Sequence, residues 1–296
     1  MCSNVCNYER STINSSYDYI VWVKLMATKD LESTSNGYQL KFNAKTHRYW
    51  MNGKPIKGVS SIKDAYPKGD GLTNWKIKQG IEQALPMYKS WFASHGFDAV
   101  PSTSKFQEII DELMIEVKKE KKTQKAADIG TLLHEYAYCK ENHLPFDNEL
   151  VNQHPDKEKV QNAIANFETW HQTSKDIVVK SEQIVGSWTH WFAGTFDRLV
   201  SRNGLMVLSD FKTSKSISVE MKLQLAAYRI AIREWLGIEA QALEILRFDK
   251  EKVGFNPEKD IWFTSDEAEM KEHEQQFLRL LATVRYDSKY NPYAKR

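Results

Sequence analysis

Cysteine is scarce in this chain: Cys2, Cys6 and Cys139 are its only three cysteines among 296 residues. Three cysteines do not form a disulfide framework, and their spacing is not that of a zinc finger. No apolar run approaches the ~20 residues that a membrane-spanning helix needs. Residues 19–23 are the nearest case, and no secretory signal precedes them. These absences exclude a disulfide-rich secreted protein and indicate a cytoplasmic protein with no membrane partner.

The chain also lacks a large excess of charge of one sign, since its net charge is +2. The distribution of charge is uneven, because residues 37–90 hold ten basic and only three acidic side chains. A second basic cluster lies at residues 118–125 and includes Lys118 and Lys122. Basic patches of this kind suit phosphate backbones. For the 118–125 cluster, a solvated helix face explains the pattern equally well.

No internal repeat or low-complexity tract divides the chain, and its length allows a sizeable core. Residues 1–36 are polar and predict a loosely ordered extension, within which Met26 is a possible natural start. Residues 37–125 predict a hairpin followed by helices, and residues 126–296 predict the main domain. Within these regions the expected strands are 39–43, 47–51, 54–59, 177–185, 189–201, 205–212, 242–248, 253–255 and 260–263. The expected helices are 72–95, 104–124, 126–142, 156–173, 219–236 and 265–285, with Ser60 or Ser61 capping a further short helix and Ser265 capping the last. This order predicts an α/β protein.

The most informative stretch of the chain runs from Gly194 to Lys212. Asn203-Gly204 between two apolar runs is a strong hairpin signal, because both residues tolerate the positive φ of a type I′ turn. Counting outward from this turn places Asp197 opposite Asp210, and Thr195 opposite Lys212. Two opposed carboxylates destabilise a sheet unless a cation lies between them.

Asp210 and Lys212 are two residues apart on one predicted strand, so both point to the same face. A hard divalent ion held by carboxylates, next to an ammonium group, is suited to the hydrolysis of phosphodiesters. The simpler alternative is a surface ion pair, since Asp-x-Lys also occurs by chance.

Further polar residues lie on the predicted elements around this hairpin. Gly130 and His134 share one helix face at a spacing of four, and the histidine is a candidate metal ligand. Glu182 lies on the preceding strand and offers another carboxylate. Gln224 and Tyr228 share one face of the following helix, and they are candidates to hold a phosphate or to orient Lys212.

Three rings precede Asp197, those of Trp188, His190 and Trp191. Such rings offer stacking surfaces to unpaired bases. For the tryptophans, packing against the sheet is the favoured interpretation.

These residues resemble a known family when they are taken together. Gly130-x3-His134, Glu182, Gly194-x2-Asp197, Asp210-x-Lys212 and Gln224-x3-Tyr228 occur in the order found in the RecB-like branch of the PD-(D/E)XK nucleases. The resemblance covers about residues 126–230. It implies a restriction-endonuclease-like core, a central mixed sheet flanked by helices, with an N-terminal β-hairpin and helical insertion.

The N-terminal region is similar to that of phage exonucleases and the mitochondrial genome maintenance exonuclease. The similarity rests on His47-Arg-Tyr, Asn52-Gly53, Gly58-Val-Ser-Ser and Leu72 to Trp75. Those proteins have a Ser-Val-Thr triplet where this chain has Gly58-Val-Ser-Ser, which is a mild departure. The similarity implies that residues 37–125 help to channel DNA.

The resemblance implies Mg²⁺ or Mn²⁺ as cofactor, and not the iron–sulfur cluster of related nucleases that carry four cysteines. As metal ligands we expect His134, Asp197, Asp210 and the backbone carbonyl of Phe211. The expected catalytic residues are Asp197, Asp210, Lys212, Glu182, Gln224 and Tyr228. The expected nucleic-acid contacts are Ser60, Ser61, Trp75, Lys76, Lys118, Lys122, Thr213 and Lys215.

The implied activity is a metal-dependent exonuclease acting on single-stranded DNA or DNA ends in replication, recombination or repair. Replication or recombination proteins are possible partners, and a phage-encoded protein would act in the host cytoplasm. Three alternatives stay open: a structure-specific or restriction-type endonuclease, an inactive DNA-binding protein on this fold, and a non-enzymatic interaction protein. Cleavage of circular single strands separates endonuclease from exonuclease, and stabilisation by Mg²⁺ argues against the interaction protein.

Overall fold

The computed structural model describes residues 30–67, 93–94 and 129–290. The chain divides into two compact units, one formed by residues 1–65 and 129–296 and the other by residues 66–128. Every helix and strand named below belongs to the first unit. Apart from residues 93 and 94, the helices predicted at 72–95 and 104–124 lie outside the described residues.

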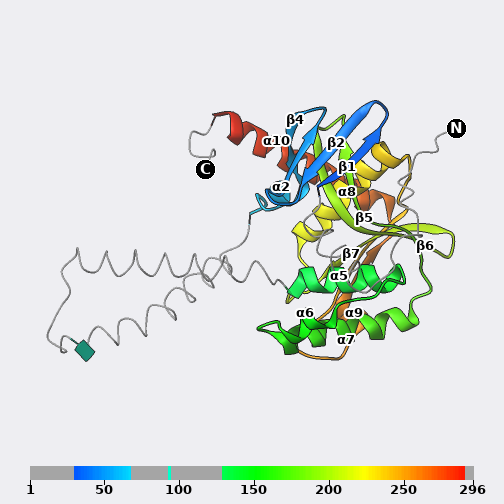
Figure 1. Ribbon diagram of the computed structural model, residues 1–296. Coiled ribbons are helices and arrows are strands. Elements are labelled where there is room, and N and C mark those ends of the chain that lie inside the picture. Colours follow the sequence, from blue (N-terminus) through cyan, green and yellow to red (C-terminus); the bar gives the residue numbers. More distant parts are fainter. Residues whose placement is uncertain (1–29, 68–92, 95–128, 291–296) are drawn as a thin grey trace, which may run out of the picture. The chain divides into compact units, whose positions relative to one another are not determined.

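A mixed nine-stranded sheet forms the centre of the first unit (Figure 1). Its strands follow the order β1-β2-β3-β4-β6-β7-β8-β9, and β5 pairs with β6 outside this path. The strands are β1 (Leu31–Ser35), β2 (Tyr38–Asn43), β3 (Arg48–Met51), β4 (Lys54–Gly58), β5 (Ile177–Ser187), β6 (Phe192–Arg202), β7 (Leu205–Lys212), β8 (Ala242–Arg247) and β9 (Ile261–Thr264). The predicted α/β class and mixed sheet are therefore confirmed.

The hairpin between β6 and β7 has the predicted turn and register. Asn203 and Gly204 have φ values of 51° and 82°, which is the left-handed backbone that a type I′ turn requires. Arg202 pairs with Leu205, and the register holds as far as Arg198 opposite Ser209. Backbone pairing stops there, so Asp197 and Asp210 lie just beyond the last paired residues.

One edge of strand β6 pairs with two different strands, β4 and β7. Along its other edge it pairs antiparallel with β5, from Phe192 to Ser201. On the shared edge, Phe192 and Ala193 pair in parallel with β4, whereas residues 198–202 pair with β7. The stretch from Gly194 to Asp197 lies between these two partners, and the sheet opens beside it.

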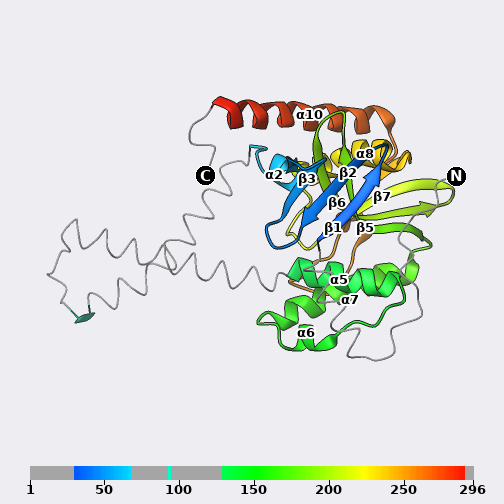
Figure 2. The ribbon, with the colours of Figure 1, turned by 45° about the horizontal axis from the view of Figure 1, so that its top comes forward.

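Helices cover both faces of the sheet, as Figure 2 shows. On one side lie α5 (Ile129–Glu141), α6 (Asn148–Asn152) and α7 (Lys157–Thr173). Their apolar faces pack on Phe211, Leu246 and Phe248 of the sheet region. On the other side lie α2 (Val59–Lys63), α8 (Val219–Leu236) and α10 (Glu267–Tyr290). The short helix α9 (Pro257–Asp260) precedes β9.

Helix α8 ends where the sequence predicted. Gly237 has a φ of 68° at the C-cap, and this left-handed conformation costs glycine little because it has no Cβ. Eleven of the 18 residues of α8 are buried, and Gln224 and Tyr228 are among them.

Several local predictions are wrong. Leu31–Ser35 form β1, which pairs with β2 along its whole length, although the sequence placed them in a loosely ordered extension. Neither Ser60 nor Ser61 caps α2, because the helix begins at Val59 with Gly58 as its N-cap. Residues 253–255 form no strand, since Asn166 and not a neighbouring strand holds that segment. Helix α10 is capped by Asp266, whose side chain accepts a hydrogen bond from Ala268 N at 2.9 Å.

None of the helices described here is both long and apolar enough to cross a membrane.

Candidate active site

Three side chains from three different elements converge beside the open stretch of β6. His134 on α5, Glu182 on β5 and Asp197 on β6 each offer one ligand atom, and these atoms lie within 4.8 Å of one another. His134 Nδ1 is 3.4 Å from Glu182 Oε1 and 3.5 Å from Asp197 Oδ2. On its other side, His134 Nε2 is 3.1 Å from the carbonyl oxygen of Phe211. A carboxylate pair and an imidazole at such distances are suited to holding a divalent cation.

Glu182 reaches this cluster through an unusual backbone conformation. The pairs Ser181–Arg198 and Gln183–Phe196 flank it, so it faces Asp197 across the two strands. Its φ is 49°, in the left-handed region that a non-glycine residue within a strand rarely adopts. Backbone strain of this kind concentrates at functional sites, where the surrounding structure enforces it.

The Asp197 carboxylate is held by the backbone of β7. Its Oδ2 accepts a hydrogen bond from Phe211 N at 2.8 Å, a side-chain contact just beyond the last paired residues of the hairpin. Phe211 therefore contacts the cluster twice, through its N–H to Asp197 and through its carbonyl to His134. Desolvation lowers the pKa of His134, but Asp197 and Glu182 outweigh it and raise the pKa to about 9. Without a metal ion, His134 is therefore an imidazolium cation at neutral pH.

Asp210 and Lys212 form a buried ion pair next to the cluster. The Asp210 side chain is fully buried, and burial raises its pKa to about 6, with Lys212 lowering it and Asp197 raising it. For Lys212, burial lowers the pKa, but the carboxylates of Asp210 and Asp197 outweigh that effect and raise it above its usual value. Lys212 is therefore an ammonium group at neutral pH, and its Nζ also lies 3.3 Å from the Phe211 carbonyl.

Gln224 and Tyr228 on α8 close the buried side of the site. Gln224 Nε2 donates to Tyr228 Oη at 3.2 Å. Burial raises the pKa of Tyr228 well above its usual value, and Tyr49, Asp197 and Asp210 raise it further. The ring approaches β6 closely, because a Cβ on Gly194 would lie 2.6 Å from Tyr228 Cε1.

The residues present fit a divalent cation on two observations. The first is the donor set itself, which combines two carboxylates, one imidazole and a nearby carbonyl. The second is a pair of buried oxygens without a hydrogen-bond partner in the described part of the chain, namely Oδ1 of Asp210 and Oε1 of Gln224, whereas Oδ2 of Asp210 contacts Lys212. Buried polar atoms normally have partners, so their absence here is consistent with a missing ion and its water.

The arrangement differs in one respect from the ligand set expected from the sequence. His134 and Asp197 lie together as expected, and the Phe211 carbonyl is close to His134. The third member of the compact group is Glu182 and not Asp210, whose carboxylate pairs with Lys212 instead. The β6–β7 ladder ends at Arg198 and Ser209, so Thr195 and Lys212 are not a backbone pair; Thr195 pairs with Ile184 of β5, and its hydroxyl contacts Tyr49.

Four of the expected nucleic-acid contacts lie in the described part of the chain. Ser60 and Ser61 are exposed on α2, while Thr213 and Lys215 follow the end of β7, the lysine exposed and the threonine half-buried. Trp75, Lys76, Lys118 and Lys122 lie outside the described residues. Trp188 stacks on Tyr38 with ring centroids 5.4 Å apart and also contacts Trp235, which agrees with the packing interpretation.

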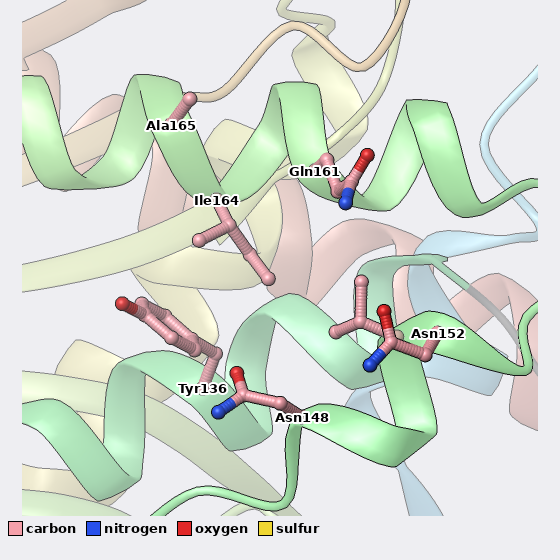
Figure 3. Close-up of a pocket in the computed structure, with 7 residues that line it drawn as sticks. Tyr136, Asn148, Asn152, Gln161, Ile164 and Ala165 are labelled. Carbon is pink, nitrogen blue, oxygen red and sulfur yellow. The ribbon is translucent and has the colours of Figure 1, made fainter.

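A hollow of about 250 Å³ lies elsewhere, between α5, α6 and α7 (Figure 3). Figure 3 shows amide side chains of Asn148, Asn152 and Gln161 at its rim, together with Tyr136 and Ile164. None of the clustered acids and histidine lines it. The site described above is therefore separate from this hollow.

Sequence reasoning gave no site role to two residues beside the site, Tyr49 and Thr195. Tyr49 lies on β3, and its hydroxyl is 3.0 Å from Thr195 Oγ1. Tyr49 occurred in the N-terminal motif, but nothing in the sequence indicated that this region joins β6. The parallel pairing of β4 with β6 brings it there, and that pairing is only two residues long.

A family model described as the PD-(D/E)XK nuclease superfamily matches residues 108–295. Comparison with curated proteins gives no match. Seventeen chains of solved structures match. One of them, titled "Crystal structure of SSO0001", is 14% identical, with 64% of this chain and 100% of that chain covered and a TM-score of 0.24. That TM-score is too low to support an argument about fold or function.

Proposed function

This chain belongs to the PD-(D/E)XK nuclease superfamily, and we propose that within it the protein is a metal-dependent exonuclease acting on single-stranded DNA or DNA ends. Membership in a nuclease superfamily implies phosphodiester hydrolysis and DNA as substrate. The choice of exonuclease, the RecB-like branch and Mg²⁺ or Mn²⁺ go further and are part of the proposal.

The observation that carries the proposal is the convergence of His134, Glu182 and Asp197 within 4.8 Å, beside the Asp210–Lys212 pair. The residues come from α5, β5, β6 and β7, so they are distant in sequence and brought together only by the fold. A chance surface ion pair would not also bring a histidine and a strained glutamate to the same place. Asp210 in particular argues against a surface ion pair, since it is fully buried next to a second carboxylate.

The proposed roles follow from this geometry. A divalent ion bound by the cluster would polarise the scissile phosphate and lower the pKa of a bound water. Asp197 is positioned for this by the N–H of Phe211, and Glu182 and His134 complete the ligand group. We assign Asp210 as a further ligand, whose negative charge also holds Lys212 in place.

Lys212 acts as a cation in this scheme. Because its pKa is raised, the ammonium group keeps its proton at neutral pH, so it is better suited to stabilising the charge that develops on the phosphate than to removing a proton from water. Gln224 and Tyr228 fix this arrangement from the α8 side. Within residues 30–67 and 129–290, Gln224 Oε1 is a buried acceptor without a hydrogen-bond partner, which could accept a hydrogen bond from an ordered water.

The preference for exonuclease over endonuclease rests on the ordered motifs and on the N-terminal resemblance. In this proposal residues 37–125 are a DNA-channelling region, residues 126–296 are the nuclease core, and Ser60, Ser61, Thr213 and Lys215 contact DNA. A cytoplasmic location and action with replication or recombination proteins belong to the same proposal.

The test uses single-stranded oligonucleotides labelled at the 5′ or the 3′ end, incubated with Mg²⁺, with Mn²⁺ or with EDTA. We expect metal-dependent shortening by the wild-type protein, with the two labels reporting the polarity. Asp210→Asn should abolish it, because the amide carries no charge to hold a cation or Lys212. Asp266→Asn is the matched control, since asparagine caps α10 as well as aspartate does.

Lys212→Ala provides a separate test of the lysine. We expect cleavage to fall by at least a hundredfold, while DNA binding and the far-ultraviolet circular dichroism spectrum stay close to wild type. Normal turnover in this variant would contradict the role given to the ammonium group.

Circular single-stranded DNA distinguishes the second candidate, a structure-specific endonuclease. An exonuclease leaves a circle intact because it has no end. Cleavage of the circle would replace the exonuclease proposal by the endonuclease one, and DNA binding without any cleavage would favour an inactive DNA-binding protein.

A further inference from the structure

A pair of hydroxyl groups lies beside the candidate active site, and no role has been given to it above. Tyr49 Oη on β3 and Thr195 Oγ1 on β6 are 3.0 Å apart, although 146 positions separate them in the sequence. The Tyr49 ring lies against β4, because a Cβ on Gly58 would meet its Cε2 at 3.2 Å. Both residues are half-buried.

The pair is adjacent to the clustered acids. Thr195 lies on β6 between Gly194 and Asp197, in the stretch where the sheet opens between β4 and β7. The charge of Glu182 raises the pKa of Tyr49, and the charge of Tyr49 raises the pKa of Tyr228. The phenol of Tyr49 is therefore close to both residues. Through Tyr49, strand β3 of the N-terminal region therefore lies beside the site.

One hydroxyl hydrogen of the pair is left over. Two hydroxyl groups carry two O–H donors, and the single hydrogen bond between them uses one. Within residues 30–67 and 129–290, no acceptor is found for the other. Desolvation raises the pKa of Tyr49, and this outweighs the opposing effect of Thr195, so the phenol keeps its proton at neutral pH. The half-buried pair thus presents a neutral donor next to a site built for an anionic substrate.

We propose that Tyr49 contacts the substrate directly, by donating a hydrogen bond to a phosphate oxygen of the bound strand, and that Thr195 is the positioning residue that aims the phenol. The inference rests on the proposed function in so far as the ligand is a DNA backbone. A phosphate oxygen is the acceptor that fits, since hydrogen bonds from a hydroxyl to a charged oxygen are short and strong. The contact carries no base information, as is general for backbone contacts.

The first test replaces Tyr49 by phenylalanine, which keeps the ring and removes only the donor. We expect the Kd for a single-stranded oligonucleotide in EDTA and the KM in Mg²⁺ to rise roughly tenfold, with kcat within about twofold of wild type. Thr195→Val should raise the Kd and the KM about threefold, because the Tyr49 phenol stays but loses the hydrogen bond that orients it.

Tyr136→Phe is the matched control, since it removes a tyrosine hydroxyl that bonds Glu168 Oε1 at 2.6 Å away from the site. If Tyr49→Phe binds and cleaves DNA like Tyr136→Phe, the proposal is overturned. A fall in kcat with unchanged Kd and KM overturns it as well, since that pattern indicates a purely structural effect on the catalytic groups.

A second measurement locates the contact on the substrate. Oligonucleotides each carrying one neutral methylphosphonate linkage are bound to wild type and to Tyr49→Phe. At one linkage we expect the methylphosphonate to weaken binding by the wild-type protein but to have little effect on binding by Tyr49→Phe. The reason is that the neutral linkage and the substitution remove the same contact. Additive losses at every linkage contradict the proposal.

These binding measurements stay informative if the nuclease assignment fails. A wild-type protein that binds DNA through Tyr49 but never cuts it supports the inference and refutes the proposed function. Normal cleavage by the wild-type protein, together with a Tyr49→Phe variant that binds and cleaves DNA like wild type, supports the proposed function and refutes the inference.

Discussion

Gly194 illustrates how a missing side chain sets the geometry of the site. Its position on β6 faces the Tyr228 ring and Val59, with a Cβ predicted to lie 2.6 Å and 3.1 Å from their nearest carbons. Because the neighbours are a fully buried ring and a β-branched side chain, neither moves away easily. The glycine therefore lets Tyr228 approach β6 beside Asp197.

We predict that Gly194→Ala destabilises the protein by about 1–3 kcal/mol and removes most of the nuclease activity, because the methyl group displaces Tyr228. Gly186→Ala is the matched control on β5, where the new methyl group meets Met51 Cε at 2.8 Å, the mobile end of a flexible side chain. Urea unfolding and cleavage assays on both variants check this. Equal stability of the two variants would contradict the argument.

At the same scale, the sequence predicted some site residues and not others. The period of a strand was enough to bring Asp210 and Lys212 together, because residues i and i+2 share a face. It did not reveal how Glu182 joins His134 and Asp197, since that depends on a positive φ at a glutamate. No local signal marks such a conformation, which only the surrounding contacts enforce.

Among the elements, the segment after β8 is held by one buried amide. Asn166 on α7 donates to the carbonyls of Asp249 and Lys252, at 2.7 Å and 2.9 Å, and accepts from Gly254 N at 2.8 Å. Its side chain is fully buried. These three hydrogen bonds replace the strand pairing that the sequence suggested for residues 253–255.

We predict that Asn166→Ala lowers the free energy of unfolding by roughly 2–4 kcal/mol, because it leaves two carbonyls and one N–H without partners. Asn162→Ala is the comparison, since that residue lies one turn earlier and makes one hydrogen bond to the segment, to Lys250 O at 3.2 Å. Its loss should cost about 1 kcal/mol. Denaturant unfolding of the two variants measures the difference, and equal losses would show that the extra bonds contribute nothing.

Element boundaries were predicted best where the local chemistry is strong. Asn203-Gly204 defined the β6–β7 hairpin, and Gly237 defined the end of α8. The joint between β4 and β6 was not predicted, because two pairs involving Lys57 and Gly58 leave no periodic pattern to detect. Short non-local pairings of this kind depend on the whole sheet.

For the molecule as a whole, a buried ion network connects α5 to the sheet. Arg198 pairs with Glu141 at 2.6 Å and with Asp176 at 2.8 Å, and Arg202 pairs with Asp176 and Glu244. Burial alone would raise the pKa of Asp176, but hydrogen bonds from the two arginines outweigh it and lower the pKa to about 2. The carboxylate is therefore more acidic in the folded protein than in the unfolded chain.

This difference makes stability depend on pH. A carboxyl with a lowered folded pKa stabilises the protein above its unfolded pKa of about 4, and the effect is lost as the pH falls toward 2. We predict that the stability gap between wild type and Asp176→Asn narrows by about 2 kcal/mol between pH 6 and pH 2. Urea unfolding across this range measures the gap, and a constant gap would contradict the assignment.

The global architecture was partly predictable. The α/β order and the mixed sheet followed from the alternation of strand and helix patterns, and the ordered motifs pointed to the superfamily. Sequence reasoning did not predict that the N-terminal strands extend the same sheet, because it treated residues 37–125 as a separate region. Only three-dimensional pairing makes β1–β4 part of the structure that carries the site.

The two-residue joint between β4 and β6 also affects what the protein must avoid. Without β4, the edge of β6 at Phe192 and Ala193 would present free N–H and C=O groups next to apolar side chains, and it would extend the edge that is already open from Gly194 to Asp197. An open edge of this composition is a template for strands of other chains. By covering this edge, the N-terminal strands protect the sheet from edge-to-edge pairing. A truncated chain that lacks them is expected to self-associate.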